Sequence, residues 1–164
     1  MVKISAIFIA VRAGEPMHQK EAVKIFPKMG IEGDRYALGL GAYSKAVPTK
    51  TRDISLITRE GIDSANRELK RLGLEEFLDH ETRRNIVIEG LSSQDLNALV
   101  GKEFYLGGLK LNATELCIPC ERPSKLSKKQ DFLKVFEGRG GIRAQILESG
   151  EIKLGDRLTE TLAI

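Results

Sequence analysis

The sequence predicts a mainly β fold, closed or partly closed into a barrel, with a few peripheral helices. Several short segments alternate apolar and polar residues, turn residues separate these segments, and helical periodicity is confined to a few stretches. No regular alternation of strands with helices is visible, which argues against a parallel sheet covered by helices. The length of 164 residues is that of one ordinary domain, so we expect a single domain over residues 1–164.

Three segments are predicted to be single strands. KISAIFIAV (3–11) alternates apolar and polar residues at period two, whereas RDISLI (52–57) and RRNIVIEG (83–90) alternate in part. These strands are expected to belong to one barrel-like sheet system.

Two further segments are predicted to be hairpins within the same sheet system. FYLGGLKLNATEL (104–116) contains two strands joined by a two-residue turn at Gly107 and Gly108. GIRAQILESGEIKLGDRL (141–158) indicates a second hairpin, which turns at Ser149 and Gly150.

Helices are few. The strongest candidate covers residues 58–73, where apolar residues recur at spacings of three and four, Thr58 can cap the start and Gly73 can end the helix. Shorter helices are predicted over 92–101 and over 128–139, the latter stopped by Gly138. Residues 36–53 show no period and predict an irregular loop, either over a site or as a plain surface excursion.

Composition excludes several classes of function. A net charge of +3, 5% aromatic residues and no tryptophan give little basis for binding nucleic acid. No apolar run approaches the roughly 20 residues that cross a bilayer, and the N-terminus alternates like a strand instead of forming a signal peptide. We therefore expect a cytoplasmic protein with no nucleic-acid or membrane partner.

The two cysteines, Cys117 and Cys120, form a C-x-x-C motif with Pro119 between them. A redox pair of the thioredoxin type would open a helix early in a βαβ unit, whereas this pair follows a predicted hairpin late in the chain. A structural zinc site would need further ligands, and His18 and His80 stand at unrelated positions. Two buried cysteines that pack as small hydrophobic residues are a further alternative.

We expect one working thiol. Arg122, Lys125, Lys128 and Lys129 follow the motif, and these cations make Cys120 the more reactive thiol. Cys117 ends an apolar strand and is expected to pack inside.

Arginines in Gly- or Asn-containing stretches are the candidate anion ligands. Arg83, Arg139 and Arg143 are predicted to surround the same cavity as Cys120, with Gly140 and Gly141 letting the backbone approach a ligand. For Asp34, capping a turn, pairing with an arginine and contacting the ligand remain open.

The chain resembles a MOSC domain, the module named after the C-terminal part of molybdenum cofactor sulfurases and also found as a small stand-alone protein. The resemblance covers nearly the whole chain. It rests on five segments in a fixed order, GIEGDRYA (30–37), RDISLIT (52–58), RRNIVIEGLSSQDLNALVGKEFYLG (83–107), LCIPCERPSKL (116–126) and GRGGIRAQILESGEIKLGD (138–156). One departure is Tyr36, which stands where the family often has a histidine.

The resemblance implies a barrel-like MOSC fold and a function associated with the molybdenum cofactor (molybdopterin). Cys120 is implied either as a sulfur (persulfide) carrier or as a molybdenum ligand, in a sulfur-transferring module or a molybdenum-cofactor-dependent reductase module. The implied cofactor-binding residues, with arginines on the pterin phosphate, are Asp34, Arg35, Arg83, Asn85, Arg139 and Arg143.

Other functions stay open. The chain could be a non-catalytic carrier of the cofactor, or a thiol-disulfide protein that uses Cys117 with Cys120. The expected partners are a small anionic cofactor and a sulfur donor or a molybdoenzyme. Pyridoxal phosphate is not expected, because 164 residues leave no room for the domain that binds it in the full-length sulfurases.

Overall fold

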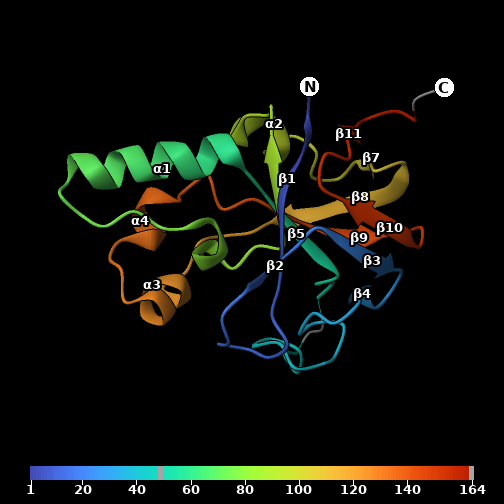
Figure 1. Ribbon diagram of the computed structural model, residues 1–164, viewed down its shortest axis with the longest axis horizontal. Helices are drawn as coiled ribbons and strands as arrows, with labels where there is room; N and C mark the ends of the chain where they lie inside the picture. Colours follow the sequence, from blue (N-terminus) through green and yellow to red (C-terminus); the bar gives the residue numbers. More distant parts are fainter. Residues whose placement is uncertain (48–49, 163–164) are drawn as a thin grey trace.

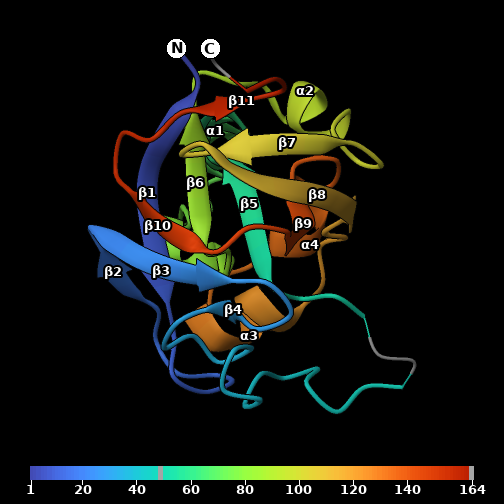
Figure 2. The same cartoon turned by 90° about the vertical axis from the view of Figure 1, so that its right-hand side faces the viewer.

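The computed structural model describes residues 1–47 and 50–162, and its main feature is an eight-stranded sheet that curls into a half-barrel (Figure 2). Its strand order is β11 (Leu158–Thr159), β7 (Glu103–Leu106), β8 (Leu109–Leu116), β9 (Ile142–Ile146), β5 (Ile54–Thr58), β6 (Ile86–Glu89), β1 (Lys3–Ile9) and β2 (His18–Lys20). A three-stranded sheet, β10 (Gly150–Lys153), β3 (Ala22–Phe26) and β4 (Gly30–Ile31), packs against it through a shared apolar core. The prediction of a mainly β, barrel-like fold is confirmed.

The predicted strands 3–11, 52–57 and 83–90 all lie in the large sheet, as β1, β5 and β6. The hairpin at Gly107 and Gly108 is also confirmed, since β7 and β8 pair antiparallel with Leu106 opposite Leu109. The unpredicted strand β3 carries Val23 and Ile25 into the core between the sheets.

The second predicted hairpin is wrong. β9 and β10 do not pair; β9 lies between β8 and β5, whereas β10 pairs antiparallel with β3. The turn residues Ser149 and Gly150 mark a crossing between the two sheets, which places Ile152 in the shared core. The pairing of β10 is therefore decided by the distant strand β3 and not by the local turn residues, which predicted a hairpin with β9.

One strand–helix–strand unit is present where we saw no such alternation. β5 and β6 pair in parallel, and the connection between them contains α1 (Arg59–Arg71) and the short 3₁₀ helix η1 (Asp79–Thr82). The apolar face of α1 covers the outer face of this strand pair, in a second core cluster with Phe77, Phe132 and Phe136. Both strands are consequently buried on two faces, which explains why they alternate only in part.

The helix predicted over 58–73 is confirmed with its caps. The Thr58 side chain accepts the backbone N–H of Gly61, and Gly73, with a φ of +73°, follows the last turn. The predicted helix 92–101 is shorter, as α2 (Ser93–Asn97), with Ser92 as its cap.

The helix predicted over 128–139 is wrong in extent. The chain instead forms α3 (Arg122–Ser127) and α4 (Phe132–Val135), because Lys128 and Asp131 between them adopt left-handed backbone conformations that interrupt a helix. α1, α3 and α4 lie on one side of the molecule, away from β3, β4 and β10 (Figure 1). The predicted irregular loop is found over the described residues 36–47 and 50–53; residues 48 and 49 lie outside the described part. Within the described ranges, no helix combines the length and apolar character needed to cross a membrane.

Candidate functional site

A cavity of about 280 Å³ opens beside the cysteine motif. Its wall combines the start of β5, the start of β6, the facing ends of β8 and β9, the first residues of α3 and parts of the 36–53 segment. Among the described residues, seven cationic side chains line it against one carboxylate, Glu115; the cations are Arg35, Lys50, Arg52, Arg83, Arg84, Arg122 and Arg143. This excess of guanidinium groups makes the cavity suited to an anion.

The two cysteines differ in exposure, as expected. Cys117 is only 3% exposed and its backbone N–H donates to the carbonyl of Gly141 at 2.8 Å. Cys120 is exposed and lines the cavity, next to Glu121, which caps the helix α3. The exposed thiol therefore shares the cavity with the arginines, while which thiol reacts stays a prediction.

Gly140 and Gly141 contact the protein's own chain. A Cβ atom at Gly140 would overlap the carbonyl oxygen of Cys117, and one at Gly141 would overlap the carbonyl oxygen of Leu56. The glycine pair lets the start of β9 approach both β5 and the cysteine segment, so in this structure the close backbone approach serves packing and not a ligand.

Arg83 is held in the cavity wall by a left-handed backbone. Arg83 ends η1 with a φ of 66°, a backbone conformation that residues other than glycine, asparagine and aspartate rarely adopt. One guanidinium nitrogen donates to the carbonyl of Glu15. Burial and then the nearby charges of Arg35 and Arg122 lower the pKa of Arg83 to about 10. All three arginines line the cavity.

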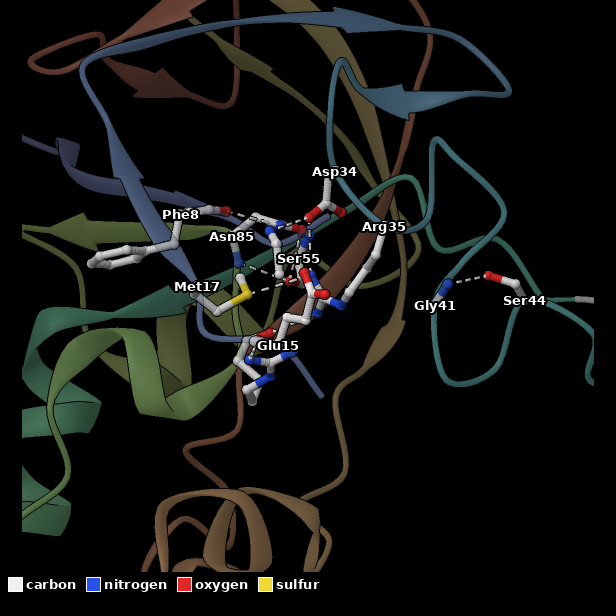
Figure 3. Close-up of polar contacts among 11 residues, drawn as sticks. Phe8, Glu15, Met17, Asp34, Arg35, Gly41, Ser44, Ser55 and Asn85 are labelled. Carbon is white, nitrogen blue, oxygen red and sulfur yellow. Dashed lines mark hydrogen bonds and ion pairs between the residues drawn. The ribbon is translucent and has the colours of Figure 1, made fainter. Parts of the chain in front are cut away.

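Asp34 lies against Arg35, one of the arginines that line the cavity (Figure 3). Its Oδ1 lies 3.0 Å from the Arg35 guanidinium and accepts the N–H of Ala10 at 3.1 Å, and both charged side chains are buried. Arg35 also donates to the carbonyl of Arg83 at 3.2 Å. Of the three roles left open for Asp34, pairing with an arginine is the one found.

Asn85 lies at the cavity, yet its carboxamide is engaged within the protein. Its Oδ1 accepts from the backbone N–H and hydroxyl of Ser55 at 3.1 and 3.2 Å, and its Nδ2 donates to the carbonyl of Phe8 at 3.1 Å (Figure 3). Asn85 therefore ties β5 and β1 to the start of β6.

Arg143 faces Glu115, the one carboxylate among the lining residues that the structure describes. It lies on β9 opposite Glu115 on β8, with 2.7 Å between its guanidinium and Oε1, while the Lys50 ammonium lies 3.6 Å from Oε2. Burial raises the pKa of Glu115, but the hydrogen bond and charge of Arg143, together with Lys50, outweigh it and lower that pKa below its ordinary value.

The structure does not bring Arg139 to this cavity, contrary to the expected convergence. Its guanidinium donates to the carbonyl of Val135 at 3.1 Å, in the helical layer. Arg84 is the arginine that reaches the glycine pair, where it donates to the carbonyl of Gly140 at 2.7 Å. Lys129 is also directed elsewhere, since its ammonium pairs with Glu81 at 2.6 Å.

Several lining residues were not among the predicted site residues. Arg122 directly follows the cysteine motif and Arg84 directly follows Arg83, so both had a signal in the sequence. The Arg52 guanidinium packs over the rings of Tyr36 and Tyr43 in cation–π contacts, 5.9 and 4.7 Å from the two ring centroids. The sequence of residues 36–53 did not indicate that Arg52 would pack against these two tyrosines.

Comparison with known proteins identifies relatives of the fold. The family model "MOSC domain" matches residues 33–159. YuaD from Bacillus subtilis has 20% identity and a TM-score of 0.74, covering 96% of this chain and 94% of its own. YiiM from Geobacillus stearothermophilus has 17% identity and a TM-score of 0.69, covering 98% of this chain and 75% of its own. YiiM from Escherichia coli also has 17% identity, with a TM-score of 0.67, and the match covers 99% of this chain and 71% of the YiiM chain. Among curated proteins, none matches the chain.

Proposed function

The chain belongs to the MOSC domain family, and on that basis we propose that its cationic cavity binds the molybdenum cofactor, with the Cys120 sulfur as a ligand of the metal. The observation that carries this proposal is the meeting of an exposed thiol with a group of close guanidinium groups in one cavity. A soft thiolate suits molybdenum, and guanidinium groups suit a phosphate.

The residues present fit such a group in charge and chemistry. Arg83 and Arg122 have no carboxylate partner among the ion pairs of the described residues, so both are available to the terminal phosphate of a pterin cofactor. Arg35, which pairs with Asp34, also lines the cavity and adds a third positive charge. The volume of about 280 Å³ is near the lower end of the roughly 300–1,000 Å³ usual for ligand sites.

Each protein group has a distinct task in this proposal. The arginines bind and orient the phosphate, Cys120 fixes the metal end, and the Tyr36–Tyr43–Arg52 group forms one wall. When bound, the cofactor supplies a metal centre that can exchange electrons or sulfur with a substrate. The protein is then either a reductase module or a carrier that passes the cofactor to another enzyme.

The exposure of Cys120 supports a second candidate, a persulfide carrier. In that reaction the Cys120 thiolate attacks the terminal sulfur of a donor persulfide. A new sulfur–sulfur bond forms on Cys120, the bond within the donor breaks, and the donor leaves as a thiolate. The sulfur donor is thus a second expected partner.

Elemental analysis separates these candidates. Protein purified gently from a host that makes the cofactor should contain molybdenum and phosphorus, and Cys120→Ser should lose the molybdenum while the matched variant Cys117→Ser keeps it. A persulfide carrier should instead show one extra sulfur on Cys120 by mass spectrometry, without metal. Wild-type protein with neither the metal nor the extra sulfur, after incubation with cofactor and with a persulfide donor, would contradict both.

A further inference from the structure

Glu115 is the one carboxylate among the described residues that line the cavity, and it contacts two of the seven cations. Its two oxygens are divided between them, with Oε1 2.7 Å from Arg143 and Oε2 3.6 Å from Lys50. The side chains of Glu115, Arg143 and Lys50 are 34%, 24% and 53% exposed, respectively. An entering ligand can therefore reach this group. A ligand anion that used Arg143 or Lys50 would have to compete with Glu115.

A β-bulge places Glu115 in this position. Along the β8–β9 pair, Ala113 is opposite Ala144, but the next partners are Glu115 and Arg143, so Thr114 is the extra residue. The Thr114 hydroxyl donates to the carbonyl of Arg143 at 3.2 Å and secures the bulge. In a regular antiparallel register without the bulge, Thr114 and not Glu115 would stand opposite Arg143.

Arg83 and Arg122 have no carboxylate competitor of this kind among the ion pairs of the described residues. The charges of Arg35 and Arg122 act on Arg83, and the buried carboxylate of Asp34, which already pairs with Arg35, and then Tyr36 offset them in part. Within the described part of the chain, the cavity therefore has cations without a carboxylate partner, Arg83 and Arg122, and a pair of cations, Arg143 and Lys50, whose charge Glu115 neutralises in part.

We infer that Glu115 is an internal counter-anion: in the ligand-free protein its carboxylate occupies the place between Arg143 and Lys50 that an anionic group of the ligand takes on binding. Glu115 thereby weakens the binding of small anions with a single charged group. A larger anionic ligand, anchored at Arg83 and Arg122, can displace it. This inference rests on the proposed function, since it concerns which anions the proposed cofactor cavity accepts.

The test measures binding of inorganic phosphate by isothermal titration calorimetry at constant ionic strength. Glu115→Gln retains the shape of the side chain and an oxygen that can accept from Arg143, but it removes the charge. We expect its phosphate affinity to rise about two- to fivefold, the range for release of a partly exposed ion pair. Glu103→Gln is the matched control, because it changes the net charge equally. Glu103 on β7 pairs with Lys110 on β8 at 3.3 Å, and it is not among the cavity-lining residues.

The outcomes separate this inference from the proposed function. Tighter binding by Glu115→Gln than by both wild type and Glu103→Gln supports the internal counter-anion. Equal affinity in the two variants overturns it, and so does weaker binding by Glu115→Gln, which would mean that Glu115 positions Arg143 for the ligand. If phosphate binds neither the wild type nor Glu115→Gln, the anion cavity fails together with this inference. Glu115→Ala replaces Glu115→Gln, with the same expected direction, should the latter fail to fold by circular dichroism.

Discussion

Asp34 and Arg35 are neighbours in the chain and form a buried ion pair, with 3.0 Å between Oδ1 and the guanidinium. Arg35 in turn donates to the backbone carbonyl of Arg83. The pair therefore connects the GIEGDRYA segment (30–37) to Arg83 in the cavity wall. The relationship makes Asp34 a support for the site, and its removal leads to the first prediction.

Replacing Asp34 by alanine should strongly destabilise the protein, because it leaves the Arg35 charge buried without a partner. We expect a loss of about 3–5 kcal/mol in the free energy of unfolding. Asp34→Asn, which keeps an oxygen acceptor for the N–H of Ala10, should lose less. Urea denaturation followed by circular dichroism measures both; equal losses in the two variants would contradict the importance of that retained acceptor.

Replacing Arg83 by asparagine should leave the ligand-free protein stable but impair anion binding. Asparagine tolerates the left-handed backbone at this position, and its neutral side chain relieves the repulsion from Arg35 and Arg122 that lowers the pKa of Arg83. Arg83→Ala retains the left-handed strain that the arginine already bears, so Arg83→Asn should be more stable than Arg83→Ala by up to about 1 kcal/mol. Phosphate affinity should fall at least about tenfold in both, consistent with losing a charge-assisted hydrogen bond. An asparagine variant as unstable as the alanine variant would contradict the backbone argument.

The contribution of Asp53 to the stability of the protein should decline as pH rises through the pKa of this carboxyl group. Burial of this side chain raises its pKa above the ordinary value of 3.8, although its Oδ2 accepts the N–H of Ile146 at 3.1 Å. The folded state then binds the Asp53 proton more tightly than the unfolded state, so the free energy of unfolding decreases with pH between 3.8 and the higher folded pKa.

Asp53→Asn should remove this contribution. Urea denaturation from about pH 4 to pH 7 should show that the stability of the wild type falls relative to this variant as pH rises. Replacing the exposed Asp95 by asparagine is the control for the loss of one carboxylate. Parallel curves for wild type and Asp53→Asn would count against a raised pKa.

Cys120 should be alkylated by iodoacetamide at neutral pH at least ~10-fold faster than Cys117, since access to the buried sulfur requires local unfolding. Peptide mapping by mass spectrometry on the wild type gives both rates. The Cys117→Ser and Cys120→Ser variants control for exchange between the two sites. Faster labelling of Cys117 would reverse the assignment of the working thiol.

Local signals in the sequence were sufficient for part of the fold. The caps Thr58 and Gly73 marked α1, and the glycine pair 107–108 marked the β7–β8 turn. The partner of β10 was not readable, because β3 is more than a hundred residues away and no turn connects the two strands. Pairing between distant strands depends on which apolar faces the whole core buries, which no short window contains.

The candidate site shows the same limit at finer scale. Arg139 and Arg143 share one glycine-containing stretch, yet only Arg143 lies on β9 and reaches the cavity. The position of Glu115 depends on a bulge at Thr114, and that of Arg83 on a left-handed backbone; neither has a residue signature such as glycine. The cysteine pair was the exception, since the apolar strand before Cys117 and the polar residues after Cys120 already indicated their different exposure.

The position of β1 in the large sheet has a consequence for how the chain matures during synthesis. β1 leaves the ribosome first, but one of its two neighbours, β6, follows it by about eighty residues. Until β6 emerges, β1 is paired only with β2 in the large sheet, and the edge that β6 later covers stays open. Late-forming pairs of this kind slow folding and leave strand edges open to other chains. A nascent chain halted before β6 should therefore depend on a chaperone more than the full chain does.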